Sequence, residues 1–239
     1  MAQLTDVLDG QSLKLVMLDL DGTLVDSLPD LTAAVDYMLK EAGFPAAGPS
    51  QVRHWVGNGA VMLVRRALAW AKGSKAPEEL SEALVEINLE CFQLYYRDHS
   101  ADNTRVFAGV REGLDALKDA GIQLMMVTNK PEEFVPSILK ETGLDGYFDV
   151  WFGGNSLPEK KPHPMPLLRL MEAAGVGPEQ ALMVGDSRSD IDAARAAGVK
   201  VVAVTYGYNH GRPVAEEGPD LLIDSLTELT ALLPDRAAV

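Results

Sequence analysis

The sequence has a single cysteine and no long hydrophobic run. Cys91 cannot form a disulfide within the chain, and no cluster of cysteine and histidine provides the ligands of a structural zinc site. No apolar stretch approaches the roughly 20 residues that span a bilayer. Residues 1–6 also lack the basic segment and apolar core of a signal peptide. We therefore expect a soluble, cytoplasmic protein that does not associate with a membrane.

Basic side chains are also scarce, because 21 lysines and arginines stand against 35 aspartates and glutamates, for a formal net charge of −14. The average field of such a chain repels a polyanion, so we expect no nucleic-acid partner. Hydrophobic residues make up 47% of the 239 positions, which is enough for a buried core and excludes general disorder. This length suits one large domain, or a core domain that carries a smaller one.

Short apolar runs recur along the chain, each followed by a turn and a helical pattern. The runs lie at 13–18, 122–127, 182–184 and 199–204, with weaker candidates at 149–152 and 220–223. Continuous apolar strands are typical of a parallel sheet, which is buried on both faces. Helical patterns occupy 110–120, 131–142, 164–174 and 189–197, and a glycine follows each within one residue. This alternation predicts a doubly wound α/β core.

Residues 28–98 interrupt the alternation, because this stretch contains helical patterns and no convincing strand. The helical patterns lie at 31–42, 50–55, 60–70 and 78–96. We predict a small helical domain at 28–98, inserted after the first strand, over a core formed by 1–27 and 99–239. The chain is expected to leave the core at 26–29, to end the insertion near 99–103 and to return to the sheet near 104–106.

Two carboxylates follow the first predicted strand. Asp19 ends the apolar run, and Asp21 comes two residues later, before Gly22 and Thr23. In open α/β sheets, ligands bind beyond the carboxyl ends of the strands, which is where both acids would lie. For these two residues alone, an Asx turn that merely ends the strand is an equally good interpretation.

A later strand ends in the same kind of residue. The run 182–185 leads to Asp186 and, four residues further, to Asp190. Asp190 alone fits the first turn of a helix, where the helix dipole favours an acid, but Asp186 ends a strand as Asp19 does. If the two strands are neighbours, the acids converge and repel one another unless a cation offsets their charge. Hard oxygen ligands of this kind suit Mg²⁺, so the sequence predicts a magnesium site.

Two further segments supply hydrogen-bond donors and a cation. Thr128 and Asn129 follow the run 122–127, where a hydroxyl and backbone N–H groups could hold a phosphoryl oxygen at a helix N-terminus. Helix capping is the simpler explanation of that pair taken alone. Lys160 and Lys161 precede a proline. Lys160 fits a surface lysine, whereas the proline restricts the backbone at Lys161, which is our candidate for the cation that balances the acids.

Together and in this order, these segments resemble the four motifs of the haloacid dehalogenase-like phosphohydrolase superfamily. The joint pattern is D-x-D-G-T, T-N, K-P and G-D-x-x-x-D, and the resemblance covers essentially the whole chain. It implies a Rossmann-like core with a helical cap inserted after the first strand. The interruption at 28–98 indicates the same insertion independently.

The resemblance also implies chemical roles. Asp19 corresponds to the nucleophile that forms an aspartyl-phosphate, and Asp21 to the acid that protonates the leaving group and then, as a base, activates water. Haloacid dehalogenases lack the second aspartate because their leaving group needs no proton, so Asp21 favours phosphate ester chemistry. The groups implied to stabilise the transferring phosphoryl group are Thr128, Asn129 and Lys161.

A magnesium ion is implied by the same resemblance. Its ligands would be the Asp19 carboxylate, the Asp21 backbone carbonyl and the Asp186 carboxylate. Asp190 is implied to complete the metal site through a bound water or to orient Lys161.

Finer features are similar to phosphoglycolate phosphatases. Residues 153–164 and 205–213 resemble segments of that family's core, and residues 52–59 resemble its specificity loop in the cap. We therefore expect a Mg²⁺-dependent phosphatase that converts 2-phosphoglycolate into glycolate and phosphate. Gly57-Asn58-Gly59 is about equally well explained as a turn before the helix at 60–70.

A two-carbon substrate has little apolar area, so its binding must depend on its phosphate and its carboxylate. We expect the cap to supply a donor for the carboxylate. The candidates are Arg53, Arg65, Arg66, Asn58 and the backbone from Gly57 to Gly59.

Two alternatives stay open at this point. The nearer one is a sugar-phosphate phosphatase or a β-phosphoglucomutase-like enzyme on the same scaffold. The more distant one is a non-catalytic interaction protein, against which the coincidence of so many reactive side chains argues strongly. We expect a small phosphorylated carboxylic acid as the binding partner, and either a monomer or a homodimer.

Overall fold

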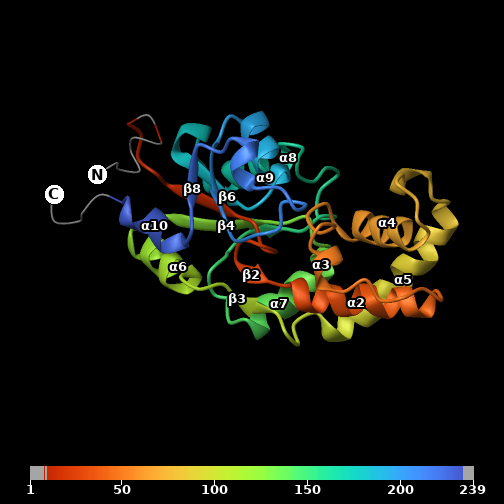
Figure 1. Ribbon diagram of the computed structural model, residues 1–239. Helices are drawn as coiled ribbons and strands as arrows, with labels where there is room; N and C mark the ends of the chain where they lie inside the picture. Colours follow the sequence, from red (N-terminus) through yellow and green to blue (C-terminus); the bar gives the residue numbers. More distant parts are fainter. Residues whose placement is uncertain (1–7, 9, 234–239) are drawn as a thin grey trace.

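The structure is a computed structural model that describes residue 8 and residues 10–233 (Figure 1). The predicted lack of a signal peptide concerns residues 1–6, which lie outside the described residues. Within the described part, no helix combines the length and apolar character that crossing a membrane requires.

A six-stranded parallel sheet forms the centre of the protein, in the order β5-β4-β1-β6-β7-β8. Its strands are β1 (Leu15–Leu18), β4 (Gln123–Val127), β5 (Trp151–Phe152), β6 (Ala181–Gly185), β7 (Lys200–Val204) and β8 (Leu221–Ile223). Every residue of β1 is buried, because this strand lies in the middle of the sheet with β4 and β6 as its neighbours. The predicted doubly wound α/β fold is confirmed.

Helices cover both faces of the sheet, because successive residues of a strand point to opposite faces. Val16 and Leu18 pack on one face against α6 (Val110–Asp119), α7 (Val135–Glu141) and α10 (Leu226–Ala231). Leu15 and Met17 pack on the other face against α8 (Met165–Ala174) and α9 (Arg188–Ala197). Figure 1 shows α8 and α9 on the opposite side of the strands from α6.

A helical insert follows the first strand. It contains α2 (Leu28–Glu41), α3 (Pro49–Val52), α4 (Ala60–Ala71), the short 3-10 helix η1 (Pro77–Glu79) and α5 (Glu82–His99). These helices extend beyond the carboxyl ends of the strands (Figure 1). They enclose a hydrophobic cluster of their own, to which α2, α4 and α5 contribute most of the buried side chains.

The sequence did not predict how the chain enters and leaves the insert. Residues 104–106 were expected to rejoin the sheet, but β3 (Arg105–Val106) pairs antiparallel with β2 (Val25–Asp26) in a separate two-stranded ribbon. Strands of two residues have no periodicity that a sequence pattern could reveal.

Several helix boundaries also differ from the prediction. The pattern at 131–142 divides into a 3-10 helix, η2 (Glu132–Phe134), and α7, which begins with a proline in its first turn. The pattern at 78–96 divides into η1 and α5, because Leu80 has an extended backbone. Helix α10 and the 3-10 helices η3 (Pro178–Gln180) and η4 (Val214–Glu217) were not predicted.

Asp30 ties the two connections of the insert together. This side chain, in the first turn of α2, is only 1% exposed. Its carboxylate accepts hydrogen bonds from the backbone N–H groups of Asn103 and Thr104 at 2.7 to 3.0 Å, and from both of their side chains. A buried carboxylate is stabilised when donors surround it in this way. Asp30 therefore fixes the start of α2 to the segment that leads into β3.

We expect the substitution Asp30→Ala to lower the free energy of unfolding by about 2–4 kcal/mol, because several buried donors lose a charged acceptor. Urea denaturation followed by circular dichroism measures this loss. Asp30→Asn keeps one acceptor and should cost less, while Asp145→Ala, at an exposed position, should change the free energy of unfolding by less than about 0.5 kcal/mol. An unfolding midpoint of Asp30→Ala equal to that of the unmodified protein would show that the connection does not depend on this carboxylate.

Candidate active site

The carboxyl ends of β1, β4 and β6 meet at one edge of the sheet. Leu18 pairs with Met126 of β4 and with Val184 of β6, so the residues that follow these three strands are neighbours in space. Asp19, Thr128 and Asp186 are thereby brought together from positions far apart in the sequence. This is the place where open α/β sheets bind ligands.

Three carboxylates converge at this edge. Oxygens of Asp19, Asp186 and Asp190 lie within 4.8 Å of one another. Asp190 is fully buried in the first turn of α9, where one of its oxygens accepts from the Ser187 backbone and hydroxyl in a capping box. The capping interpretation of Asp190 and its membership of the acidic cluster are therefore both correct.

Lys161 is the cation of this cluster. Its ammonium lies 3.0 Å from an Asp19 oxygen and 2.6 Å from an Asp190 oxygen, and it donates to the backbone carbonyl of Val127 at 2.8 Å. Burial alone would lower the pKa of Lys161, but Asp19 and Asp190 raise that pKa above its ordinary value. Lys161 is therefore charged, and the structure brings it to the acids as the sequence predicted.

One lysine does not balance three acids. Burial, together with the neighbouring carboxylates, raises the pKa of Asp19 to about 7, although Lys161 acts in the opposite direction. Burial likewise raises the pKa of Asp186 well above its ordinary range, and the charges of Asp190 and Asp19 add to this effect. The buried carboxylate oxygens and their surplus of negative charge fit a hard divalent cation such as Mg²⁺.

The Asp186 carboxylate is held in place by its surroundings. It accepts hydrogen bonds from the Thr23 hydroxyl at 3.2 Å and from the Tyr208 backbone N–H at 2.5 Å. A Cβ atom at Gly207 would lie 2.2 Å from the Asp186 Cβ, and one at Gly22 would lie 2.3 Å from an Asp186 oxygen. Both positions therefore require glycine.

Asp21 interacts with a different cation. Its carboxylate accepts from the Ser27 hydroxyl at 2.6 Å and from the Lys130 ammonium at 2.9 and 2.8 Å. Burial alone would lower the pKa of Lys130, but Asp21 raises it above its ordinary value. Asp19 and Asp21, two residues apart in the sequence, thus pair with different lysines.

Sequence reasoning missed Lys130. The signal was its position directly after Thr128 and Asn129, because a third polar residue beyond a strand end also lies at the ligand-binding edge. A lysine three residues beyond a strand is common on protein surfaces, and its partner Asp21 is 109 positions away. The structure shows instead that only 5% of Lys130 is exposed.

Thr128 and Asn129 occupy the predicted place beside the acids. The Thr128 hydroxyl accepts from the Lys130 backbone N–H at 3.2 Å, which is a local turn contact. The Asn129 amide donates to the backbone carbonyls of Gly57 at 3.1 Å and Lys161 at 2.9 Å. Asn129 therefore joins the core, the lysine segment and the helical insert.

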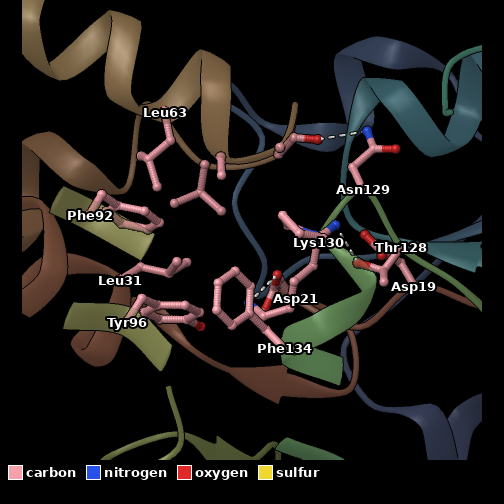
Figure 2. Close-up of a pocket in the computed structure, with 15 residues that line it drawn as sticks. Asp19, Asp21, Leu31, Leu63, Phe92, Tyr96, Thr128, Asn129, Lys130 and Phe134 are labelled. Atoms are coloured by element: carbon pink, nitrogen blue, oxygen red, sulfur yellow. Dashed lines mark hydrogen bonds and ion pairs between the residues drawn. The ribbon is translucent and has the colours of Figure 1, made fainter. Parts of the chain in front are cut away.

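A pocket lies between the strand ends and the insert (Figure 2). Figure 2 shows Asp19, Thr128 and Asn129 on one side and Leu63, Phe92 and Tyr96 on the other. The lining residues from the core are Asp19, Asp21, Thr128, Asn129, Lys130, Pro131 and Phe134, and those from the insert are Leu31, Val56, Gly57, Gly59, Ala60, Leu63, Phe92 and Tyr96. The core wall is thus mainly polar and the insert wall mainly apolar.

The loop at 57–59 closes the pocket against the core. Gly57 lines the pocket, and Gly59 has a positive φ of 86°. A Cβ at Gly59 would lie 3.0 Å from the backbone oxygen of Asn129, so the loop approaches the core as closely as glycine permits. The Asn58 side chain does not line the pocket. Its amide donates a hydrogen bond to the Ser189 hydroxyl, and its side-chain oxygen accepts one from Arg66.

The arginines predicted to bind a carboxylate point elsewhere. Arg53 donates to the backbone carbonyls of Tyr206 and Gly207. Arg65 pairs with Glu82, and Arg66 donates to the Trp55 backbone carbonyl. None of the three lines the pocket among the described residues.

Comparison with known proteins agrees with this geometry. The model of the haloacid dehalogenase-like hydrolase family matches residues 16–204. A phosphoglycolate phosphatase of Pseudomonas putida is 52% identical over 92% of this chain and 79% of its own length. Phosphoglycolate phosphatase 1 of Pseudomonas aeruginosa is 54% identical over 90% of this chain and 78% of its own length.

A solved structure also matches the whole fold. The crystal structure of a protein from Haemophilus somnus, described as a predicted phosphoglycolate phosphatase, has a TM-score of 0.87 and 42% identity. The match covers 93% of this chain and 98% of the other. Sequence, fold and the converging strand ends therefore agree, and the chain belongs to the haloacid dehalogenase-like hydrolase family.

Proposed function

We propose that the protein is a phosphoric monoester hydrolase that cleaves 2-phosphoglycolate into glycolate and phosphate and depends on Mg²⁺. The observation that carries this proposal is the convergence of Asp19, Asp186, Asp190 and Lys161 at one strand-end edge, with Asp19 and Asp21 lining the pocket beside it. The names of the relatives, which are about half identical to this chain, support the choice of substrate.

Asp19 acts as the nucleophile in this proposal. One of its oxygens attacks the phosphorus, and the bond between phosphorus and the ester oxygen breaks, which leaves an aspartyl-phosphate and an alkoxide. Asp21, in the same pocket, gives the alkoxide a proton and afterwards takes a proton from the water that hydrolyses the aspartyl-phosphate. In this proposal the end of β1 holds both carboxylates at the reacting atoms.

The transferring phosphoryl group gathers negative charge that needs fixed donors. The charge of Lys161, the Thr128 hydroxyl and the backbone N–H of Asn129 lie beside Asp19 and would serve this purpose. The carboxylates of Asp19 and Asp186, with the Asp21 backbone carbonyl, would hold Mg²⁺, and Asp190 would support the site and orient Lys161. When bound, the metal neutralises charge on the phosphoryl oxygens.

The helical insert serves as a cap in this proposal, with 28–98 as the cap and 1–27 and 99–239 as the core. The contact of Asn129 with Gly57 and that of Lys160 with the Asn58 backbone carbonyl, at 3.0 Å, seat the loop at 57–59 on the core. Closure by this loop keeps bulk water from the reacting groups. The cytoplasmic location and the choice between monomer and homodimer stay predictions from the sequence.

Phosphate release from a panel of small phosphate esters tests the proposed function. We expect a large preference for 2-phosphoglycolate in the presence of Mg²⁺ and loss of turnover when a chelator removes the metal. Turnover spread over hexose phosphates would contradict the substrate, and conversion of one hexose phosphate into an isomer would indicate a mutase. No release from any ester would contradict the proposed chemistry as a whole.

We expect Asp19→Asn to abolish turnover, because an amide oxygen is too weak a nucleophile to form the acyl phosphate. The purified variant should keep its circular dichroism spectrum while phosphate release falls by at least about 1,000-fold. Asp145→Asn, at an exposed position away from the pocket, is the matched control and should retain activity. Phosphate release by Asp19→Asn at the rate of the control would refute the nucleophile assignment.

We expect Mg²⁺ to raise the melting temperature of the protein, because a cation that binds only the folded state stabilises it. At a metal concentration of 100 times the dissociation constant, the gain is about 2.7 kcal/mol. Differential scanning fluorimetry with and without Mg²⁺ measures the shift. Asp186→Asn should abolish most of it and Asp145→Asn should preserve it, and an equal shift in both variants would place the metal elsewhere.

A further inference from the structure

Lys130 is the single cationic residue among the described residues that line the pocket. Its ammonium contacts both oxygens of Asp21 and lies 4.9 Å from the centre of the Tyr96 ring. An ammonium group has three N–H donors. Since the two contacts to Asp21 use two of them, one donor is left for an acceptor that enters the pocket.

Tyr96 supplies a second donor next to Lys130. This side chain, on α5 of the insert, is 1% exposed, and its hydroxyl has no hydrogen-bond partner within the described part of the chain. A buried hydroxyl without a partner is destabilising, so the Tyr96 hydroxyl is able to donate to a group that enters the pocket. The side-chain oxygen of Asn129 is also unpartnered, but an amide oxygen only accepts and therefore does not suit an anion.

The covalent structure of the proposed substrate places its carboxylate near this pair. In 2-phosphoglycolate, a single methylene group separates the carboxylate from the ester oxygen. Asp21 is proposed to protonate that oxygen, so the carboxylate must lie within a few bond lengths of Asp21. Lys130, which donates to Asp21 at 2.8 Å, is therefore within reach of the carboxylate.

The remaining wall on this side is apolar. Leu31, Leu63, Phe92 and Phe134 line it (Figure 2). A carboxylate in such surroundings is unfavourable unless a cation and hydrogen-bond donors accompany it. Attraction between opposite charges is also stronger where water is excluded. The one cation of the pocket thus determines where a second anionic group can bind.

We propose that the Lys130 ammonium and the Tyr96 hydroxyl form the subsite that binds the carboxylate of the substrate, with Lys130 bridging that carboxylate and Asp21. This inference rests on the proposed function. It assigns recognition of the carboxylate to a lysine of the core and a tyrosine of the insert. The subsite therefore selects esters with an anionic group one carbon from the ester oxygen over neutral alkyl phosphates.

The test compares kcat/KM for 2-phosphoglycolate with kcat/KM for ethyl phosphate, which has the same two-carbon chain but a methyl group in place of the carboxylate. Lys130→Met removes the charge and keeps much of the side-chain volume. We expect it to lower kcat/KM roughly 10- to 100-fold more for 2-phosphoglycolate than for ethyl phosphate, the range for a lost charged hydrogen bond. Comparing the two substrates cancels the effect of Lys130 on Asp21, which both substrates experience.

Tyr96→Phe provides an independent variant that removes only the unpaired hydroxyl. We expect its melting temperature to be unchanged or higher, and its preference for 2-phosphoglycolate to fall roughly 3- to 10-fold, the range for one neutral hydrogen bond. Lys118→Met is the matched control, because Lys118 is exposed and donates to the Gly146 backbone carbonyl away from the pocket. It should keep the preference of the unmodified protein.

Equal losses on both substrates in Lys130→Met would overturn the subsite and leave the phosphatase function intact. If Lys130→Met does not fold, the ratio in Tyr96→Phe decides in the same way, and an unchanged ratio overturns the subsite. If the unmodified protein hydrolyses other esters but not 2-phosphoglycolate, the proposed substrate fails and this inference fails with it. A selective loss in both variants, with Lys118→Met unchanged, supports the subsite.

Discussion

The burial of three carboxylates side by side governs the candidate site. Asp19, Asp186 and Asp190 share a space in which Lys161 is the nearest cation. Parallel strands bring them there, because the register of β1 with β6 places their ends side by side. The fold therefore creates a region of strong negative potential that a metal ion can enter. Under the proposed function a cation at this place would also offset the repulsion between these carboxylates and a phosphate dianion.

The two acids at the end of β1 have different environments although they are neighbours in sequence. Asp19 faces the acidic cluster, and its pKa is raised mainly by burial. Asp21 faces Lys130 and the Ser27 hydroxyl. A nucleophile needs to be close to the phosphorus and its charge-stabilising groups, whereas an acid–base group needs to be close to the leaving oxygen. Because Asp19 pairs with Lys161 and Asp21 pairs with Lys130, one short turn holds an acid at each of these two positions.

Much of this arrangement was predictable from the sequence. Asp19, Asp186 and Thr128 each follow an apolar strand, and neighbouring parallel strands end at the same edge, so local patterns and one topological rule place them together. Lys161 followed from the need for a cation. These predictions depend on properties that a few consecutive residues determine.

The parts that were missed depend on distant contacts. Lys130 is defined by its pairing with Asp21 across 109 positions, and no local pattern separates it from a surface lysine. Arg53 was a candidate for binding an anion, and its guanidinium donates to the backbone carbonyls of Tyr206 and Gly207, contacts that its own segment of the sequence does not reveal. The ribbon of β2 and β3 has two residues in each strand, too few for any periodicity to show. In each case the role of the residue or strand depends on a partner that is distant in the sequence and close only in the folded structure.

The connection between core and insert has a consequence for how such proteins diversify. Because β2 pairs with β3, and Asp30 binds Asn103 and Thr104, the chain leaves and re-enters the core at adjacent points. A module with adjacent ends can lengthen, shorten or be exchanged without moving a strand of the sheet. The insert can therefore vary while the acidic edge of the core stays in place, so one reaction centre can be combined with different substrate-binding covers.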